Sequence, residues 1–278
     1  MKKTIIILIL ILAVSLSAES WKKTGDFSLL LSQSYYSDNW VGSEIGNVNW
    51  TASLNFIMEK QLNAMLYDKN TLIMSFGQTH NQVRDDAGDL YWEKPTISTD
   101  LIDYENMLSF TLQKFVDPYL ALRWESKFID EADTLETFYI NPNTLTLSLG
   151  AKKSLITKDN QSLETRLGAA YKNIFNQDAD IDNMNNAGAE MVVAYWYLFP
   201  SELGKFDSSL RLYQALMSSE DITDEWKAMD VEFKNTLTLK LSSYVGFKLY
   251  AEVLYDKEIL DETRFKEILG VNLSYSLF

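Results

Sequence analysis

The sequence predicts an all-β protein, a transmembrane antiparallel up-and-down β-barrel of about twelve strands, and three observations lead to that prediction. Segments in which apolar and polar residues alternate recur along the chain. The connections between these segments alternate between short and long. The first residues have the layout of a secretory signal peptide. Alternation with a period of two sends one face of each strand toward lipid and the other toward a polar lumen.

The N-terminal layout consists of Met1, Lys2 and Lys3, an apolar run over 5–14, and small residues up to Ser20. This run is shorter than the roughly 20 apolar residues that cross a bilayer as a helix. We therefore expect a signal peptide over 1–18 and a single barrel domain over 19–278. The chain contains no cysteine, so a disulfide framework is excluded. An export signal followed by a barrel predicts the outer membrane of a Gram-negative cell.

The clearest alternation lies over 229–241, where every odd-numbered residue except Asn235 is apolar and the even positions hold charged residues or threonine. The pattern restarts at Val245 after Ser242 and Ser243, so these two segments predict a hairpin. The segment over 188–199 is apolar on both faces, and its register stays open. All four prolines fall between alternating segments, where a missing backbone donor does not interrupt a ladder.

Twelve strands are expected in chain order. They span about 26–36, 47–66, 71–81, 102–114, 119–129, 143–153, 161–175, 188–199, 206–217, 226–241, 245–255 and 264–278.

Short connections are predicted near 68–70, 116–118, 158–160, 200–204 and 242–243, and long ones over about 37–46, 82–101, 130–141, 176–187, 218–225 and 256–263. Bacterial outer-membrane barrels have short periplasmic turns and longer external loops. An even number of strands then places both ends of the barrel on the periplasmic side.

The last predicted strand ends in Phe278, and this ending resembles the C-terminal signal that the barrel assembly machinery reads. The segment from Ser32-Gln33 to Asn39-Trp40-Val41-Gly42 resembles an uncharacterised outer-membrane family, domain of unknown function 3078. Ser43 stands where that family has a second glycine. Further likeness comes from Trp92 and from Ser98-Thr99-Asp100. The resemblance implies an outer-membrane barrel and supplies neither an activity nor functional residues.

The formal net charge of −14 is concentrated in the predicted long connections. One reading is a solvated acidic rim that keeps the loops soluble. The other is that Ca²⁺ or Mg²⁺ collects there and bridges the rim to phosphates of lipopolysaccharide. Asp178, Asp180 and Asp182 alternate as at the start of a calcium loop, but the glycine and final acid of an EF-hand are absent. A weak cation site and a disordered polar loop therefore stay open as alternatives.

The inward face predicted by the alternation is rich in charge. A lysine or arginine facing lipid near the midplane costs about 2 to 4 kcal/mol, so these side chains are expected to line the lumen. They are Arg123, Lys127, Arg166, Lys172, Arg211, Lys234, Lys240, Lys248 and Lys266, opposed by Glu105, Glu125, Glu164, Asp230, Glu232 and Glu252. They predict either a polar path with a mildly cationic waist or a network of ion pairs that plugs the barrel. Small residues such as Gly150 and Gly168 favour the open path.

Enzyme chemistry is not expected, because His80 is the only histidine available to activate a serine. The sequence contains no phosphate-binding glycine loop, and it contains no basic aromatic patch of the kind that binds nucleic acid. The sequence therefore predicts a passive or weakly selective channel for small hydrophilic solutes, without a cofactor. The alternative is a non-conducting structural or ligand-binding barrel that presents acidic external loops. The expected partners are membrane lipid, lipopolysaccharide and the assembly machinery.

Overall fold

The computed structural model of the protein describes residues 21–36, 45–86, 88–112, 115–131, 137–178, 182–219 and 225–278. The predicted signal peptide lies outside these ranges. So do Asn39, Trp40 and Gly42 of the family resemblance, and Asp180 of the predicted cation loop.

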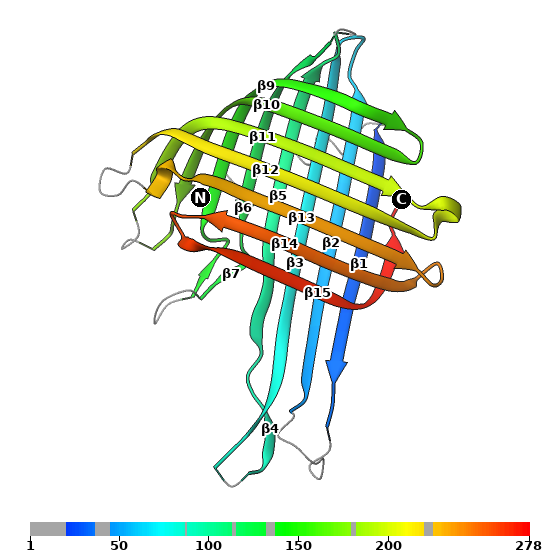
Figure 1. The fold of residues 1–278 in the computed structure, drawn as a ribbon, viewed down its shortest axis with the longest axis vertical. Coiled ribbons are helices and arrows are strands. Elements are labelled where there is room, and N and C mark those ends of the chain that lie inside the picture. The colour runs from blue at the N-terminus through cyan, green and yellow to red at the C-terminus, as the bar shows by residue number, and fades with distance from the viewer. Residues whose placement is uncertain are drawn as a thin grey trace.

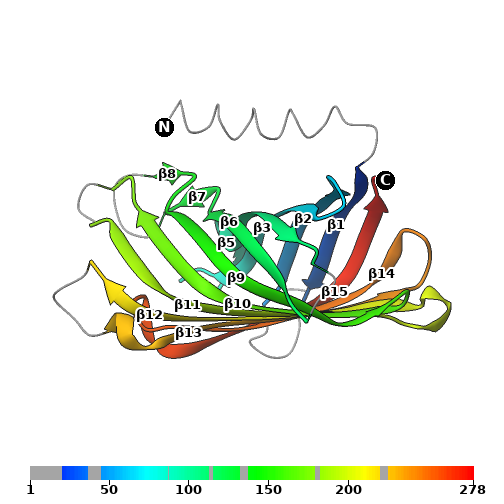
Figure 2. The same ribbon diagram turned by 90° about the horizontal axis from the view of Figure 1, so that it is seen from above.

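Twelve strands form a closed antiparallel barrel, which confirms the predicted fold class (Figure 1). They are β1 (Lys22–Ser34), β2 (Asn47–Gln61), β3 (Leu66–Arg84), β5 (Thr96–Phe110), β6 (Asp117–Ser126), β9 (Asn143–Lys158), β10 (Gln161–Phe175), β11 (Met184–Leu198), β12 (Gly204–Ser218), β13 (Met229–Lys240), β14 (Val245–Asp256) and β15 (Leu260–Ser276). Each pairs with the next around the barrel, and β1 pairs with β15 to close it (Figure 2).

Among the described residues, the connections between the barrel strands contain five short elements. They are β4 (Leu90–Trp92), β7 (Ile129–Asp130), β8 (Phe138–Tyr139) and the 3-10 turns η1 (Pro200–Glu202) and η2 (Glu225–Lys227). Strand β4 pairs with the end of β3, and this hairpin projects beyond the body of the barrel (Figure 1). Within the described part of the chain, no helix is long and apolar enough to cross a membrane.

The outer surface of the barrel is apolar. On β13 the odd-numbered Met229, Phe233 and Leu239 are exposed, as the alternation predicts. On the neighbouring pair β9 and β10, Leu149 and Leu167 are 59% and 61% exposed. Large apolar side chains in such numbers on a closed barrel face lipid, because no second layer covers them. The barrel is therefore a transmembrane barrel.

Two short connections lie earlier in the chain than the sequence predicts. Residues 68–70, expected to turn, belong to β3, and Asp68, Lys69 and Asn70 pair with both β2 and β5. The turn occupies 62–65, where the Asn63 side chain accepts hydrogen bonds from the backbone N–H groups of Met65 and Leu66 at 2.9 and 3.0 Å. Asn63 therefore supplies the turn chemistry that the Asp68–Asn70 triplet suggested.

The second early connection joins β5, which ends at Phe110, to β6, which begins at Asp117, whereas the sequence predicts it at 116–118. The Asp117 carboxylate accepts a hydrogen bond from the Leu112 backbone N–H at 2.8 Å, and Asp117 itself begins β6. Pro118 thus stands just inside the strand rather than in the turn, a position that proline tolerates.

The predicted long connection over 256–263 is wrong. Strand β14 continues to Asp256 and β15 begins at Leu260, so only 257–259 lie between them. Residues 260–263 are largely polar, which suggested a loop. Ladder hydrogen bonds join backbone groups, however, so polar side chains at the rim do not prevent a strand from continuing.

The open register of β11 is settled by its neighbours. Val192 is paired with both Arg166 and Arg211, which places the even-numbered residues of β11 on the same face as these arginines. Glu190 belongs to that face and is 2% exposed. The odd-numbered Met191 faces outward and is 38% exposed.

Candidate functional site: the charged lumen

A network of ion pairs occupies the middle of the lumen. Arg123 on β6 donates from Nε and Nη2 to the two carboxylate oxygens of Asp103 at 3.0 and 2.7 Å. Its Nη2 also lies 2.7 Å from Glu125 and 3.5 Å from Glu232. Arg123 is 6% exposed, so its charge is compensated by carboxylates rather than by water.

Two further arginines extend this network. Arg166 on β10 forms a two-bonded ion pair with Glu105 of β5. Arg211 on β12 pairs with Glu190 and lies 3.4 Å from Glu105 and 3.7 Å from Glu232. Glu105 therefore receives two arginines from two different strands.

These contacts cross the lumen. Four strands (β9, β10, β11 and β12) separate β6 from β13 along the shorter path around the barrel, yet Arg123 reaches Glu232. Arg211 likewise reaches Glu105 although four strands separate β12 from β5. Figure 2 shows β5 and β6 on the opposite side of the barrel from β12 and β13. We call this set the waist network.

The waist network is acid-rich within the described residues. Its six carboxylates are Asp103, Glu105, Glu125, Glu190, Glu232 and Glu252, and its four cationic groups are Arg123, Arg166, Arg211 and Lys234. The sequence predicted a mildly cationic waist because Asp103 and Glu190 were not counted. Asp103 has the same strand parity as Glu105 and could have been found by that signal. Glu190 could not, because its strand is apolar on both faces.

The wall of small residues is covered from inside the barrel. Tyr119 of β6 is 3% exposed, and a Cβ added at Gly168 would lie 2.8 Å from its hydroxyl oxygen. The Arg166 guanidinium lies 5.5 Å from the centre of the Tyr119 ring. Gly168 therefore leaves room for the Tyr119 side chain. The open path that the small residues suggested stays a prediction.

Other predicted lumen residues form separate pairs or lie at the rims. Lys172 lies 2.9 Å from Asp230, and Lys152, which the sequence did not single out, lies 3.4 Å from Glu164. Lys127 and Lys240 have side chains that are 47% and 52% exposed. Lys127 follows the end of β6, and Lys240 is the last residue of β13. These two contribute to the mouths of the barrel, not to its middle.

Two lysines of the lumen face form no ion pair among the described residues, although Lys248 has the Asp207 carboxylate in its surroundings and Lys266 lies opposite Glu252. Lys248 on β14 has no ion pair there. Lys266 on β15 donates to the Ser98 carbonyl oxygen and to Thr99 Oγ1, both at 2.9 Å. Ser98 and Thr99 belong to β5, which is separated from β15 by β1, β2 and β3. Lys266 therefore makes a second bridge across the lumen.

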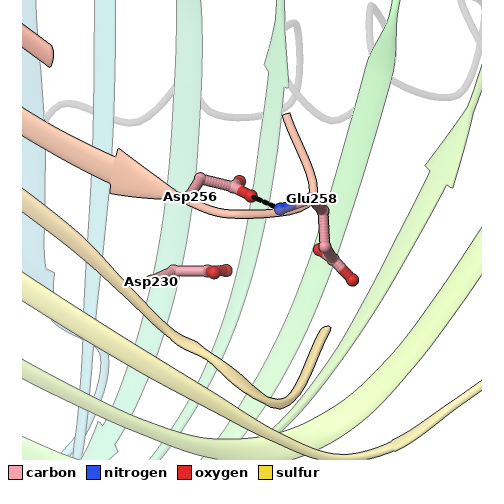
Figure 3. A group of neighbouring side chains, drawn as sticks. All are labelled: Asp230, Asp256 and Glu258. Carbon is pink, nitrogen blue, oxygen red and sulfur yellow. Dashed lines mark hydrogen bonds between the residues drawn. The ribbon is translucent and has the colours of Figure 1, made fainter. Parts of the chain in front are cut away.

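Three carboxylates gather at the mouth that carries the long connections. Asp230 on β13, Asp256 at the end of β14 and Glu258 in the following turn each offer an oxygen within 4.8 Å of the others (Figure 3). The Glu258 backbone N–H donates to Asp256 at 3.1 Å, and the Asn186 side chain donates to Glu258 at 3.0 Å. We call these three residues the acidic mouth cluster.

The acidic mouth cluster already has a cationic neighbour, the Lys172 ammonium beside Asp230. Burial raises the pKa of Glu258 above its usual value, and the nearby Asp256 and Asp230 carboxylates raise it further against the opposing effects of Lys172 and Asn186. The cluster is thus a partly neutralised acidic surface. Its members were not predicted as a group, because the turn that joins Asp256 to Glu258 was read as part of a long loop.

The predicted cation loop contributes nothing to this cluster. The Asp178 backbone N–H donates to Asn176 at 2.9 Å, and Asp182 is exposed. His80, the only histidine, lies on β3 opposite Val48. The absence of enzyme activity and of a cofactor stay predictions.

No protein-family model and no curated protein matches the chain. Among solved structures, the COG4313 outer membrane channel from Pseudomonas putida F1 is 14% identical, with 94% of this chain and 96% of that chain covered and a TM-score of 0.48. The translocator domain of autotransporter NalP from Neisseria meningitidis is 8% identical, with 93% and 89% covered and a TM-score of 0.38. OccK7 from Pseudomonas aeruginosa is 10% identical, with 94% and 100% covered and a TM-score of 0.30.

Proposed function

We propose that this protein is a passive channel for small hydrophilic solutes in the outer membrane of a Gram-negative cell, and that the waist network limits its conductance. The observation that carries the proposal is the pair of contacts from Arg123 to Glu232 and from Arg211 to Glu105, which join opposite walls. A lumen lined by charged groups is a polar path through the membrane. Side chains that meet across it narrow that path at one level.

The same observation favours a second candidate, a non-conducting barrel. A barrel of twelve strands lies between those of eight, which side chains fill, and those of sixteen, which hold a water channel. Buried arginines held by several carboxylates are costly to displace. Removing one partner of a buried ion pair lowers the stability of a protein by about 3 to 5 kcal/mol. In this case the projecting β3–β4 hairpin and the acidic mouth cluster would carry the function.

Conductance of the refolded protein in planar bilayers separates the two. We expect the wild type to show small, stable ohmic steps. A variant with Arg211→Ser and Glu190→Ser removes one cationic and one anionic side chain together, so the charge balance of the lumen is kept. Because these side chains form part of the bridge, we expect steps several times larger than those of the wild type.

The matched control carries Lys257→Ser and Asp261→Ser, an ion pair of 3.0 Å outside the waist. It should conduct as the wild type does. Silence of both the wild type and the Arg211/Glu190 variant, with both proteins folded, would reject the channel and support the non-conducting barrel.

A further inference from the structure

Two cationic side chains on the lumen face of β15 form no ion pair within the described residues, although one of them, Lys266, lies opposite Glu252 of β14. Arg264 and Lys266 lie two positions apart on this strand and therefore share a face. Both lie nearer to the mouth with the long connections, because β15 begins there at Leu260. Neither has an ion pair within the described residues, whereas every arginine of the waist network has at least one.

The guanidinium of Arg264 has buried donors without an acceptor. Its Nε and Nη2 are both shielded from solvent and have no hydrogen-bond partner in the described part of the chain. These two nitrogens form one edge of the group. Arg123 uses that same edge to hold both oxygens of Asp103. The edge is suited to two parallel bonds with a carboxylate or phosphate, and at Arg264 such a partner is missing.

A buried hydroxyl group, which can donate or accept a hydrogen bond, lies beside Lys266. The Ser98 hydroxyl is buried without a partner, and the carbonyl oxygen of the same residue accepts a hydrogen bond from Lys266. Lys266 uses two of its three N–H donors for Ser98 and Thr99, so one donor remains. A buried polar group without a partner costs free energy, and a ligand that supplies an acceptor recovers it.

We propose that Arg264, Lys266 and Ser98 form a binding site for a small solute that carries a carboxylate or phosphate group. The unused N–H donors belong to two cationic residues, Arg264 and Lys266, and the Ser98 hydroxyl can donate as well, so we expect the ligand to be an anion. The Arg264 side chain would turn its Nε–Nη2 edge to the ligand as Arg123 does to Asp103. The inference that this site selects among solutes rests on the proposed channel function. Binding of an anion to the site requires no conduction.

Isothermal titration calorimetry of the refolded protein in detergent tests the site, with acetate and inorganic phosphate as separate probes. We expect the wild type to bind at least one probe. Arg264→Gln should weaken that binding about tenfold or more, since a charge-assisted bidentate contact is lost. Lys266→Gln should weaken it as well, and Arg264→Lys should restore part of it.

Arg84→Gln is the matched control, because it makes the same chemical change in the exposed projection beyond the barrel. It should bind as the wild type does. The proposal is overturned if the wild type binds neither probe, or if Arg264→Gln and Lys266→Gln both bind unchanged. Should Arg264→Gln fail to fold, the wild type and Lys266→Gln still decide. A barrel that is silent in bilayers but binds the probes rejects the channel and leaves the anion site standing.

Discussion

Arginines inside this barrel differ by their surroundings, not by their sequence context. Arg123, Arg166 and Arg211 each meet carboxylates from other strands, and two of these carboxylates come from across the lumen. Arg264 has the same chemistry and the same alternation but finds no acceptor among the described residues. The groups that face a charged residue at an inward position therefore decide whether it forms a structural ion pair or keeps hydrogen-bond donors that a ligand can use.

Lys248 provides a test of selectivity at the residue scale. It faces the lumen and has no ion pair among the described residues, whereas Lys234 pairs with Glu232 and Glu252. Charge reversal at Lys248 should therefore shift ion preference toward cations, measured as the reversal potential in a salt gradient. Arg84→Glu, which reverses a charge on the exposed projection beyond the barrel, is the control. Unchanged preference in a conducting barrel would contradict the placement of Lys248 in the path.

Glu258 predicts a dependence of stability on pH. Burial raises its pKa above the usual 4.5, helped by Asp256 and Asp230, so the folded protein holds this proton more tightly than the unfolded chain does. Its contribution to the free energy of unfolding therefore falls as pH rises from about 4.5 through the folded pKa. The variant Glu258→Gln cannot ionise at this position, so it does not lose this part of the free energy of unfolding as pH rises. The stability gained by the variant over the wild type should grow between about pH 4 and pH 7.

Urea unfolding in lipid vesicles measures this difference, in which the pH effects of groups that do not interact with Glu258 cancel. Asp261→Asn, at a carboxylate whose side chain is 61% exposed, is the control. If the free energies of unfolding of Glu258→Gln and the wild type differ by the same amount at all pH values, the pKa of Glu258 is not raised by folding.

At the scale of elements, a close approach of two strands in the barrel wall can be tested at β9 and β10. A Cβ added at Gly150 would lie 2.1 Å from the Leu167 backbone oxygen and 2.4 Å from the Gly168 Cα. Neither atom belongs to a flexible side chain, so the backbone itself must move. We expect Gly150→Ala to lower the free energy of unfolding by about 1 to 3 kcal/mol.

Ser154→Ala on the same strand is the control, because Ser154 is exposed and its hydroxyl has room. It should change stability by less than about 0.5 kcal/mol. Equal stability of Gly150→Ala and the wild type would mean that the two strands are farther apart than described.

The strands themselves followed from the alternation, and each of the twelve expected segments lies largely within one barrel strand. The errors lie at strand ends. Asp68–Asn70 has the residues of a turn but pairs on both sides, and residues 260–263 look like a loop but extend β15. Backbone ladders continue wherever a neighbour offers hydrogen bonds, and a single segment of sequence does not contain that neighbour.

At the scale of the whole molecule, closure of the barrel is the property to test. A closed barrel in detergent resists unfolding until it is heated, because it has no free edge. The refolded protein should therefore migrate faster on a gel before boiling than after. Identical migration of boiled and unboiled samples would contradict a stable closed barrel.

The sequence by itself determined the class of fold, the faces of most strands and the lumen side of most charges, because a period of two is a local property of the chain. It left open whether those charges line a path or bridge it. The tertiary structure decided which of them meet across the lumen, since Arg123 meets Glu232 and Arg211 meets Glu105 only after the barrel has closed. Contacts across a lumen join residues about a hundred positions apart in sequence, 109 for Arg123 and Glu232, and no local pattern records them.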